Sequence, residues 1–370
     1  MADVITYVGL DVHQASIAVA RLTGRDRTPE IWEIPNDRPA VRRLARKLRR
    51  EPSGALACCY EAGSCGYAVQ RQLIAEDVPC QVIAPALMPR KPGDRVKTDR
   101  RDARKLAELV RAGLLTAVHP PTPADESARD LVRARDDARV DRQRCPHRLG
   151  KLLLRRGLRP PGRAWAQAQT RWIDSLTWEH DTERRVVEDY RLALAQIEAR
   201  LQALDAALTE LAATLPYREA VGWLRCFRGI DTLTAITILA ELHDVRRFPS
   251  ARALMAYLGV VPGEHPSGET TRRGRVTKTG NALVRRVQIG AAWQYQHRPG
   301  IGKGLAQRRV GQPARVMAIA DQAQQRLCER FRLLALTRMP PPKIAVAVAR
   351  ELDGFVWAVL QGPSAATNRG

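Results

Sequence analysis

Residues 5–22, ITYVGLDVHQASIAVARL, constrain the fold more than any other stretch of the chain. They predict two short strands joined by a tight turn, because apolar residues fill the first half and alternate with small or charged residues in the second. Asp11 stands where the first strand ends. A carboxylate there adds little to packing but can hold a cation at the open edge of a sheet. The segment therefore predicts a sheet domain with a site at the end of its first strand.

The charge balance predicts a polyanionic partner. The 370 residues include 61 Lys and Arg against 39 Asp and Glu, which gives a net charge of +22. Most of the excess is arginine, whose planar guanidinium suits phosphate. We therefore expect nucleic acid as the partner, although solvated arginines alone would give the same composition.

Other global features predict a globular protein of the cytoplasm. A hydrophobic content of 45% suits two or three domains with their own cores. No apolar run approaches the ~18 residues of a membrane helix, and the N-terminus leads straight into a strand without a signal peptide. The seven scattered Cys indicate reduced thiols. We expect a cytoplasmic protein without a membrane partner.

Strand and helix signals alternate up to about residue 115. After the first hairpin, the patterns predict strands at 29–34, 55–60 and 80–84, and helices at 38–50, 66–76 and 98–112. Three strands, a helix, a strand, a helix, a strand and a helix is the order of a RuvC-like, or ribonuclease-H-like, α/β fold. Crossovers through helices imply a mixed sheet with a parallel part. We assign this fold to residues 1–118.

The next region, residues 119–216, is predicted to be helical. An Arg-rich helix is expected over 125–158, with a kink at Pro146. Apolar residues from Val187 to Leu215 recur at steps of three and four, which is typical of a coiled coil. A helical hairpin within one chain needs the same stripe. We favour self-association into a dimer or tetramer and keep internal packing as the alternative.

The last region, residues 217–370, is predicted to be an α-helical domain with a helical tail. Helices on either side of Gly229 resemble helix-hairpin-helix DNA binders, although a generic helical turn has the same features. A Gly-rich basic loop is expected over 265–275, followed by a helix from about Asn281. The whole chain is thus expected to combine an α/β domain, a helical coiled-coil region and a helical C-terminal domain.

Four acids are candidates for a metal site. Asp99 and Asp102 are three residues apart on a predicted helix, so both project from one face. Such like charges are unfavourable unless a cation or the neighbouring arginines compensate them. Asp11 and Glu61 end the first and fourth predicted strands, and these positions converge with that helix in a ribonuclease-H-like sheet. Hard oxygen ligands of this kind suit Mg²⁺ or Mn²⁺, which can bridge a scissile phosphate.

Ser267 is a candidate nucleophile within a basic segment. A serine in a Pro-Ser-Gly sequence is usually only a turn residue. A hydroxyl becomes an effective nucleophile where nearby cations neutralise the phosphate that it attacks. The basic residues that follow, which we expect to bind nucleic acid, are Arg272, Arg273, Arg275, Lys278, Arg285 and Arg286.

Four segments together resemble the DEDD transposases of the IS110 family of insertion sequences: YVGLDVHQASIAVA, CYEAG, KTDRRDARKLAEL and YLGVVPGEHPSGETTRRGRVTKTGNALVRR. The resemblance covers nearly the whole chain in order. It implies that the family's acids fall on Asp11, Glu61, Asp99 and Asp102, and its catalytic serine on Ser267. It further implies a covalent phosphoserine link to DNA, divalent-metal assistance, and a structured non-coding bridge RNA that pairs with donor and target DNA.

The resemblance also implies association with the bacterial nucleoid, and an oligomer in which the serine and the acids can come from different subunits. Two positions depart from the family. Glu269 stands where a second Gly is frequent, and it places a negative charge near the expected phosphate site. Pro146 stands where a basic residue is frequent. Neither departure removes a proposed catalytic group.

Three other functions compete with this one. A metal-dependent junction-resolving nuclease would use the acids alone and leave Ser267 idle. A sugar kinase or actin-like ATPase also opens with a strand hairpin and an Asp, but small residues normally cradle ATP phosphate where this chain has His13 and Gln14. A binding protein without chemistry is the third, although every proposed catalytic residue is present.

Overall fold

A computed structural model describes residues 5–50, 54–89, 98–159, 161, 167–267 and 270–362. At 264–267 and 270–273, and at positions 167, 168 and 170, only the backbone is described. The chain forms two compact units, residues 1–121 and 122–370. The finer division into three domains at 118 and 216 stays a prediction.

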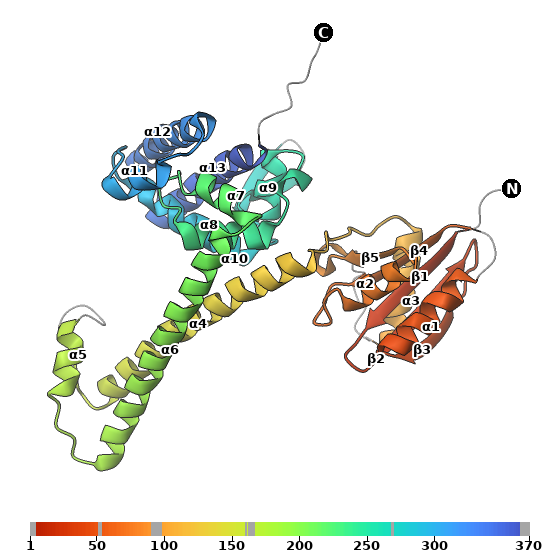
Figure 1. Cartoon of the computed structure of the whole chain (residues 1–370), viewed down its shortest axis with the longest axis horizontal. Helices are drawn as coiled ribbons and strands as arrows, with labels where there is room; N and C mark the ends of the chain where they lie inside the picture. The colour runs from red at the N-terminus through yellow and green to blue at the C-terminus, as the bar shows by residue number, and fades with distance from the viewer. Residues whose placement is uncertain are drawn as a thin grey trace, which may run out of the picture. The chain divides into compact units, whose positions relative to one another are not determined.

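The first unit contains a five-stranded sheet in the order β3-β2-β1-β4-β5 (Figure 1). The strands β1 and β2 and the strands β2 and β3 are antiparallel, whereas β4 runs parallel to both β1 and β5. This arrangement confirms the predicted mixed α/β sheet and is consistent with a RuvC-like fold. The strands are β1 (Thr6–Val12), β2 (Ser16–Thr23), β3 (Glu30–Pro35), β4 (Leu56–Glu61) and β5 (Cys80–Ile83).

Helices cover both faces of this sheet because its central strands are apolar on both sides. On one face, Val8 and Leu10 pack in a core with α1 (Arg38–Arg49) and α2 (Ala68–Ala75). On the other face, small residues of β2 pack against α3 (Asp99–Arg111). Successive residues of a strand point to opposite faces, so the odd-numbered residues of β1 lie on the α3 side.

Gly9 sets how closely α3 approaches the sheet. A Cβ atom placed on Gly9 would lie 2.2 Å from the carbonyl oxygen of Ala103 and 2.5 Å from the amide nitrogen of Ala107. Both atoms belong to the backbone of α3, so no side-chain rotation can relieve the overlap. Glycine therefore allows the helix to lie against β1, and this contact brings the N-terminal turn of α3 towards the end of that strand.

Two long helices dominate the start of the second unit: α4 (Pro123–Arg155) and α6 (Asp181–Ala213). They pair antiparallel, since Arg135 binds Asp205 at 2.7 Å and Arg142 binds Glu198 at 2.9 Å. The leucine-rich stripe of α6 therefore has a partner in its own chain, which is the alternative we favoured less. A coiled coil between chains is not confirmed. The helix α4 continues through Pro146.

The remainder of the second unit is a helical bundle with one β-hairpin. The hairpin corrects the predicted basic loop and the predicted all-helical C-terminal domain, because β6 (Pro262–Ser267) and β7 (Thr270–Val276) pair antiparallel. The helix expected before Gly229 spans Tyr217–Leu224. The other helices are α5 (Gln167–Asp174), α7 (Tyr217–Leu224), α8 (Thr232–Leu242), α9 (Ala251–Tyr257), α10 (Ala282–Ala292), α11 (Lys303–Arg309), α12 (Ala314–Leu336) and α13 (Pro341–Leu360).

Two further expectations concern the cysteines and the membrane. All seven cysteines are free thiols, and six of them are buried. None of the helices in the described part of the chain has the length and hydrophobicity that crossing a bilayer requires.

Candidate functional site

Asp11 and Glu61 lie on neighbouring strands of the first unit and on the same face. The register pairs Gly9 with Cys59 and Leu10 with Tyr60. Gly9 meets α3, and Cys59 packs with Leu106 of that helix. Two residues further along each strand, Asp11 and Glu61 therefore project to the α3 side at the carboxyl ends of parallel strands. The sequence prediction that these acids share one edge agrees with this geometry.

Asp99 and Asp102 occupy the first turn of α3, after the N-cap residue Thr98. The unpaired amides at a helix N-terminus favour negative charge, which suits two acids there. Their carboxylates lie close enough to Asp11 for repulsion between the negative charges to affect it. The pKa of Asp11 is raised above its ordinary value, mainly because the group is half-buried, while His13 opposes the shift.

Three of these side chains form a compact group of possible metal ligands. Asp11, His13 and Asp99 each offer one ligand atom, and the three atoms lie within 4.8 Å of one another. The Nε2 atom of His13 is 3.2 Å from Asp11 Oδ2 and 3.5 Å from Asp99 Oδ1. In the described part of the chain, neither Glu61 nor Asp102 belongs to this group.

The residues present fit a divalent cation. Two carboxylates and one imidazole supply oxygen and nitrogen ligands, and a cation would relieve the negative charge that Asp99 and Asp102 add beside Asp11. Sequence reasoning placed Asp11 and Asp99 in the site but missed His13, which was considered only as a turn residue. Its spacing of two residues from Asp11 was the available signal.

Ser267 lies in the second unit, at the end of β6, where it pairs with Thr270 of β7. Its side chain, and those of Arg272 and Arg273, are outside the described part of the structure, as are Gly268 and Glu269. The departure at Glu269 therefore stays an expectation.

Backbone contacts fix the base of this hairpin. Thr277 donates its amide to the carbonyl of Val261 at 3.0 Å, and Lys278 donates to that of Gly259 at 3.0 Å. Gly259 has φ +64°, and a Cβ atom there would lie 2.4 Å from the amide nitrogen of Thr279. The close approach requires glycine, so α9 and the end of β7 are held together at this point.

Of the predicted nucleic-acid-binding residues, Arg285 and Arg286 contact the protein itself. Arg285 donates from Nη1 to the carbonyl oxygens of Leu258 at 2.9 Å and Thr279 at 2.8 Å. Arg286 forms an ion pair with Asp136 of α4. Arg275 and Lys278 are exposed. Nucleic-acid binding by all of these residues stays a prediction, and the contacts of Arg285 and Arg286 indicate a positioning role as well.

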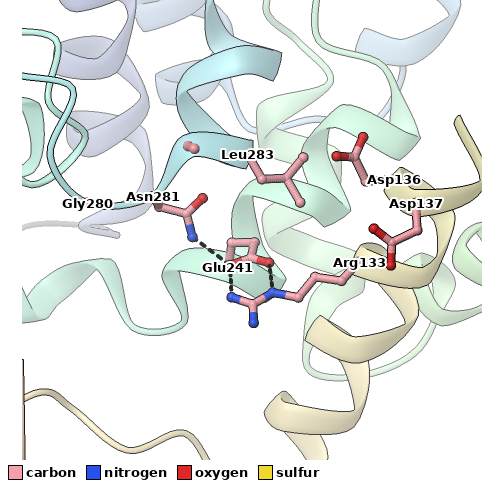
Figure 2. A pocket seen from close by; sticks show the side chains of 8 residues that line it. Arg133, Asp136, Asp137, Glu241, Gly280, Asn281 and Leu283 are labelled. Carbon is pink, nitrogen blue, oxygen red and sulfur yellow. Dashed lines mark hydrogen bonds and ion pairs between the residues drawn. The ribbon is translucent and has the colours of Figure 1, made fainter. Parts of the chain in front are cut away.

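A polar cavity of about 450 Å³ lies beside the residues that follow the hairpin (Figure 2). Glu241, on α8, is 3% exposed and accepts two hydrogen bonds from Arg133 of α4, at 2.7 and 3.0 Å. Asn281 also donates to Glu241, and its Oδ1 caps α10 by accepting from the Val284 amide at 2.9 Å. One buried carboxylate thus joins α4, α8 and α10. No motif in the sequence indicates this carboxylate.

We expect Glu241→Ala to lower the free energy of unfolding by about 2 kcal/mol, because Arg133 and Asn281 both lose their acceptor. The corresponding change in Tm is about −4 to −8 °C, measured by differential scanning calorimetry. Glu210→Ala, at an exposed position of α6, is the matched control and should leave Tm unchanged. Equal Tm values for the two variants would show that the Glu241 network contributes nothing to stability.

Two family models and several known proteins are similar to this chain. A DEDD transposase model of IS110 elements matches residues 8–156, and a model described as a transposase of the IS116/IS110/IS902 family matches residues 223–306. The chain is 38% identical over 357 residues to y4qE of Sinorhizobium fredii. The aligned region covers 95% of this chain and 88% of that protein.

Two further relatives extend the comparison. The transposase for insertion sequence element IS1533 of Leptospira borgpetersenii is 36% identical over 339 residues, covering 89% of this chain and 96% of its own length. The uncharacterized 43.6 kDa protein of insertion element IS110 of Streptomyces coelicolor is 23% identical over 396 residues, covering 90% and 94%. The matched regions contain Asp11, Asp99 and Ser267.

Proposed function

Since the chain belongs to the IS110 family of insertion-sequence transposases, we propose that it cuts and rejoins DNA through a phosphoserine at Ser267, with a structured non-coding RNA selecting the sites. The roles of Ser267 and of the RNA rest on membership of this family. The observation that carries the metal-dependent chemistry is the convergence of Asp11 and Asp99 at one edge of the sheet, with Glu61 and Asp102 beside them. Such an acid cluster is costly without a cation and useful where a phosphate must be neutralised.

Asp11 and Asp99 would hold a divalent cation, Mg²⁺ or Mn²⁺, and Glu61 and Asp102 would complete its surroundings. When bound, the cation supplies positive charge to the phosphate under attack. Asp11, at the end of β1, and Asp99, in the first turn of α3, would fix the place of the cation relative to the sheet. Hard carboxylate oxygens suit both ions.

The chemical step exchanges one phosphodiester for another. The Ser267 oxygen forms a bond to phosphorus while the bond from phosphorus to a deoxyribose oxygen breaks. The serine proton is lost and the leaving sugar oxygen gains one, so charge and atoms balance. The reverse reaction with the hydroxyl of another strand releases the serine and joins the DNA. Ser267 and the acids belong to different units of the chain. The proposed reaction needs both at one phosphate, and they can come from one subunit or from different subunits of a dimer or tetramer.

Nucleic-acid binding is supported by surfaces as well as by net charge. A cavity of about 590 Å³ on the second unit is lined mainly by basic residues of α4, with Tyr190 of α6 at its side. Cations bind phosphate and an aromatic ring can stack on a base, so this surface suits donor DNA, target DNA or RNA. The basic lining residues are His147, Arg148, Lys151 and Arg155.

A second candidate function is a metal-dependent junction-resolving nuclease that uses the carboxylates only. The ligand group favours it in one respect, because Asp11, His13 and Asp99 all lie in residues 1–121 and need nothing from the second unit. In that case water would replace the serine hydroxyl, and no covalent intermediate would form.

Reconstitution with defined nucleic acids tests the proposal. The full chain is incubated with Mg²⁺, DNA carrying the ends of the insertion sequence, a target duplex, and RNA transcribed from the non-coding DNA beside the reading frame. We expect strand exchange and a covalent protein–DNA adduct only when the RNA is present, and binding that weakens steeply with salt because many cations displace counterions. Nicking without an adduct would establish the nuclease, and RNA-independent exchange would overturn RNA guidance.

A further inference from the structure

His13 holds a fixed place between the two carboxylates of the ligand group. Its backbone closes the turn from β1 to β2, since its amide donates to the Ser16 carbonyl at 2.9 Å and its own carbonyl accepts from Asn36 Nδ2 at 2.7 Å. The Nε2 atom points at both acids, 3.2 Å from Asp11 and 3.5 Å from Asp99. The turn thus aims the ring at the acids.

We propose that His13 is a ligand of the bound cation through Nε2 and that it makes the site prefer Mn²⁺ over Mg²⁺. This inference rests on the proposed metal site at Asp11 and Asp99. The three ligand atoms lie within 4.8 Å of one another, so one ion can be shared by them after small side-chain movements.

The chemistry of the donor set gives the metal preference. Mg²⁺ requires near-ideal octahedral oxygen coordination and keeps several waters, so an imidazole in its shell is unfavourable. First-row transition ions accept nitrogen ligands more readily. At a site with two carboxylates and one imidazole, Mn²⁺ would take the imidazole nitrogen as a ligand, whereas Mg²⁺ would keep a water molecule in that position.

Mn²⁺ titration of the full chain, followed by electron paramagnetic resonance, tests the inference without measuring activity. Electron spin echo modulation detects ¹⁴N of a coordinated imidazole directly. We expect the ¹⁴N signal in the unmodified protein and its loss in His13→Asn and His13→Gln. Mn²⁺ affinity should fall by about tenfold or more, since even residues one shell further out affect affinity by that factor. Mg²⁺ affinity, measured by competition with Mn²⁺, should change less than about twofold, because Mg²⁺ would keep water in place of the imidazole.

His119→Asn, an exposed histidine in the same unit, is the matched control and should keep the ¹⁴N signal and the Mn²⁺ affinity. Circular dichroism verifies that each variant is folded. Bound Mn²⁺ without ¹⁴N coupling in the unmodified protein would overturn the role of His13 and leave the carboxylate site standing. Mn²⁺ binding that is unaffected by Asp11→Asn would instead overturn the proposed metal site.

Discussion

Ser267→Ala is expected to abolish covalent attachment of DNA and strand joining while leaving nucleic-acid binding intact. Alanine keeps the small size of the residue but lacks the oxygen that forms the bond to phosphorus, so the nucleophilic route loses its reacting atom. A fall of at least about a thousandfold in joining is expected. The measurement is denaturing electrophoresis of labelled DNA after incubation with the protein, RNA and Mg²⁺, in which an adduct migrates with the protein.

Ser127→Ala is the matched control, because Ser127 is an exposed serine of α4. It should form the adduct at the unmodified rate. Persistence of the adduct in Ser267→Ala would show that another residue is the nucleophile. If Ser267→Ala loses nothing and both proteins nick DNA without an adduct, the acids act with water and the junction-resolving nuclease is the better description.

The sheet was predictable because its signals are local. Alternating apolar residues marked each strand, and apolar stripes marked the helices between them. The order of these elements then left few topologies for a mixed sheet. The closeness of α3 to β1 was not predictable. In the sequence, Gly9 is an ordinary residue of a predicted strand, and only the structure shows that the backbone of Ala103 lies against it.

The hairpin of β6 and β7 was missed because its residues carry loop signals. Pro262, Gly263 and Pro266 normally weaken a strand, yet the pairing depends on backbone groups that residue type hardly reports. The apolar stripe on α6 shows a different limit of prediction from sequence. Its period correctly indicated a helix with an apolar face, but a period says nothing about whether the partner helix belongs to the same chain. Here α4 is that partner.

Asp11 and Glu61 could be placed together from their positions at strand ends, and Asp99 and Asp102 from their spacing on a helix, whereas the partners of other charged residues depended on tertiary contacts. A count of charges from the sequence treats Arg285 and Arg286 as free. In the fold, Arg285 donates to backbone carbonyls and Arg286 forms an ion pair with Asp136. Glu241 has no motif, because its importance comes from burial and from Asn281, which is 40 residues away in sequence. These contacts are set by packing of whole helices.

Asp11→Asn is expected to reduce cleavage and joining by about a thousandfold or more, because loss of a charged metal ligand removes several kcal/mol of charge stabilisation at the phosphate. RNA and DNA binding should persist, since the arginine surfaces are unchanged. Cleavage rates and filter binding, measured on the same preparations, separate the two effects. Asp26→Asn, at an exposed turn of the same unit, is the control and should retain full activity.

Thermal stability without metal then distinguishes a catalytic acid from a structural one. Burial raises the pKa of Asp11, so the folded state holds its proton to higher pH than the unfolded state, and stability falls as pH rises through that interval. Asparagine carries no charge and escapes this loss. Asp11→Asn should therefore have an equal or higher Tm than the unmodified protein at neutral pH, and Mn²⁺ should raise the Tm of the unmodified protein alone. A lower Tm without metal, together with lost RNA binding, would mean that Asp11 maintains the fold.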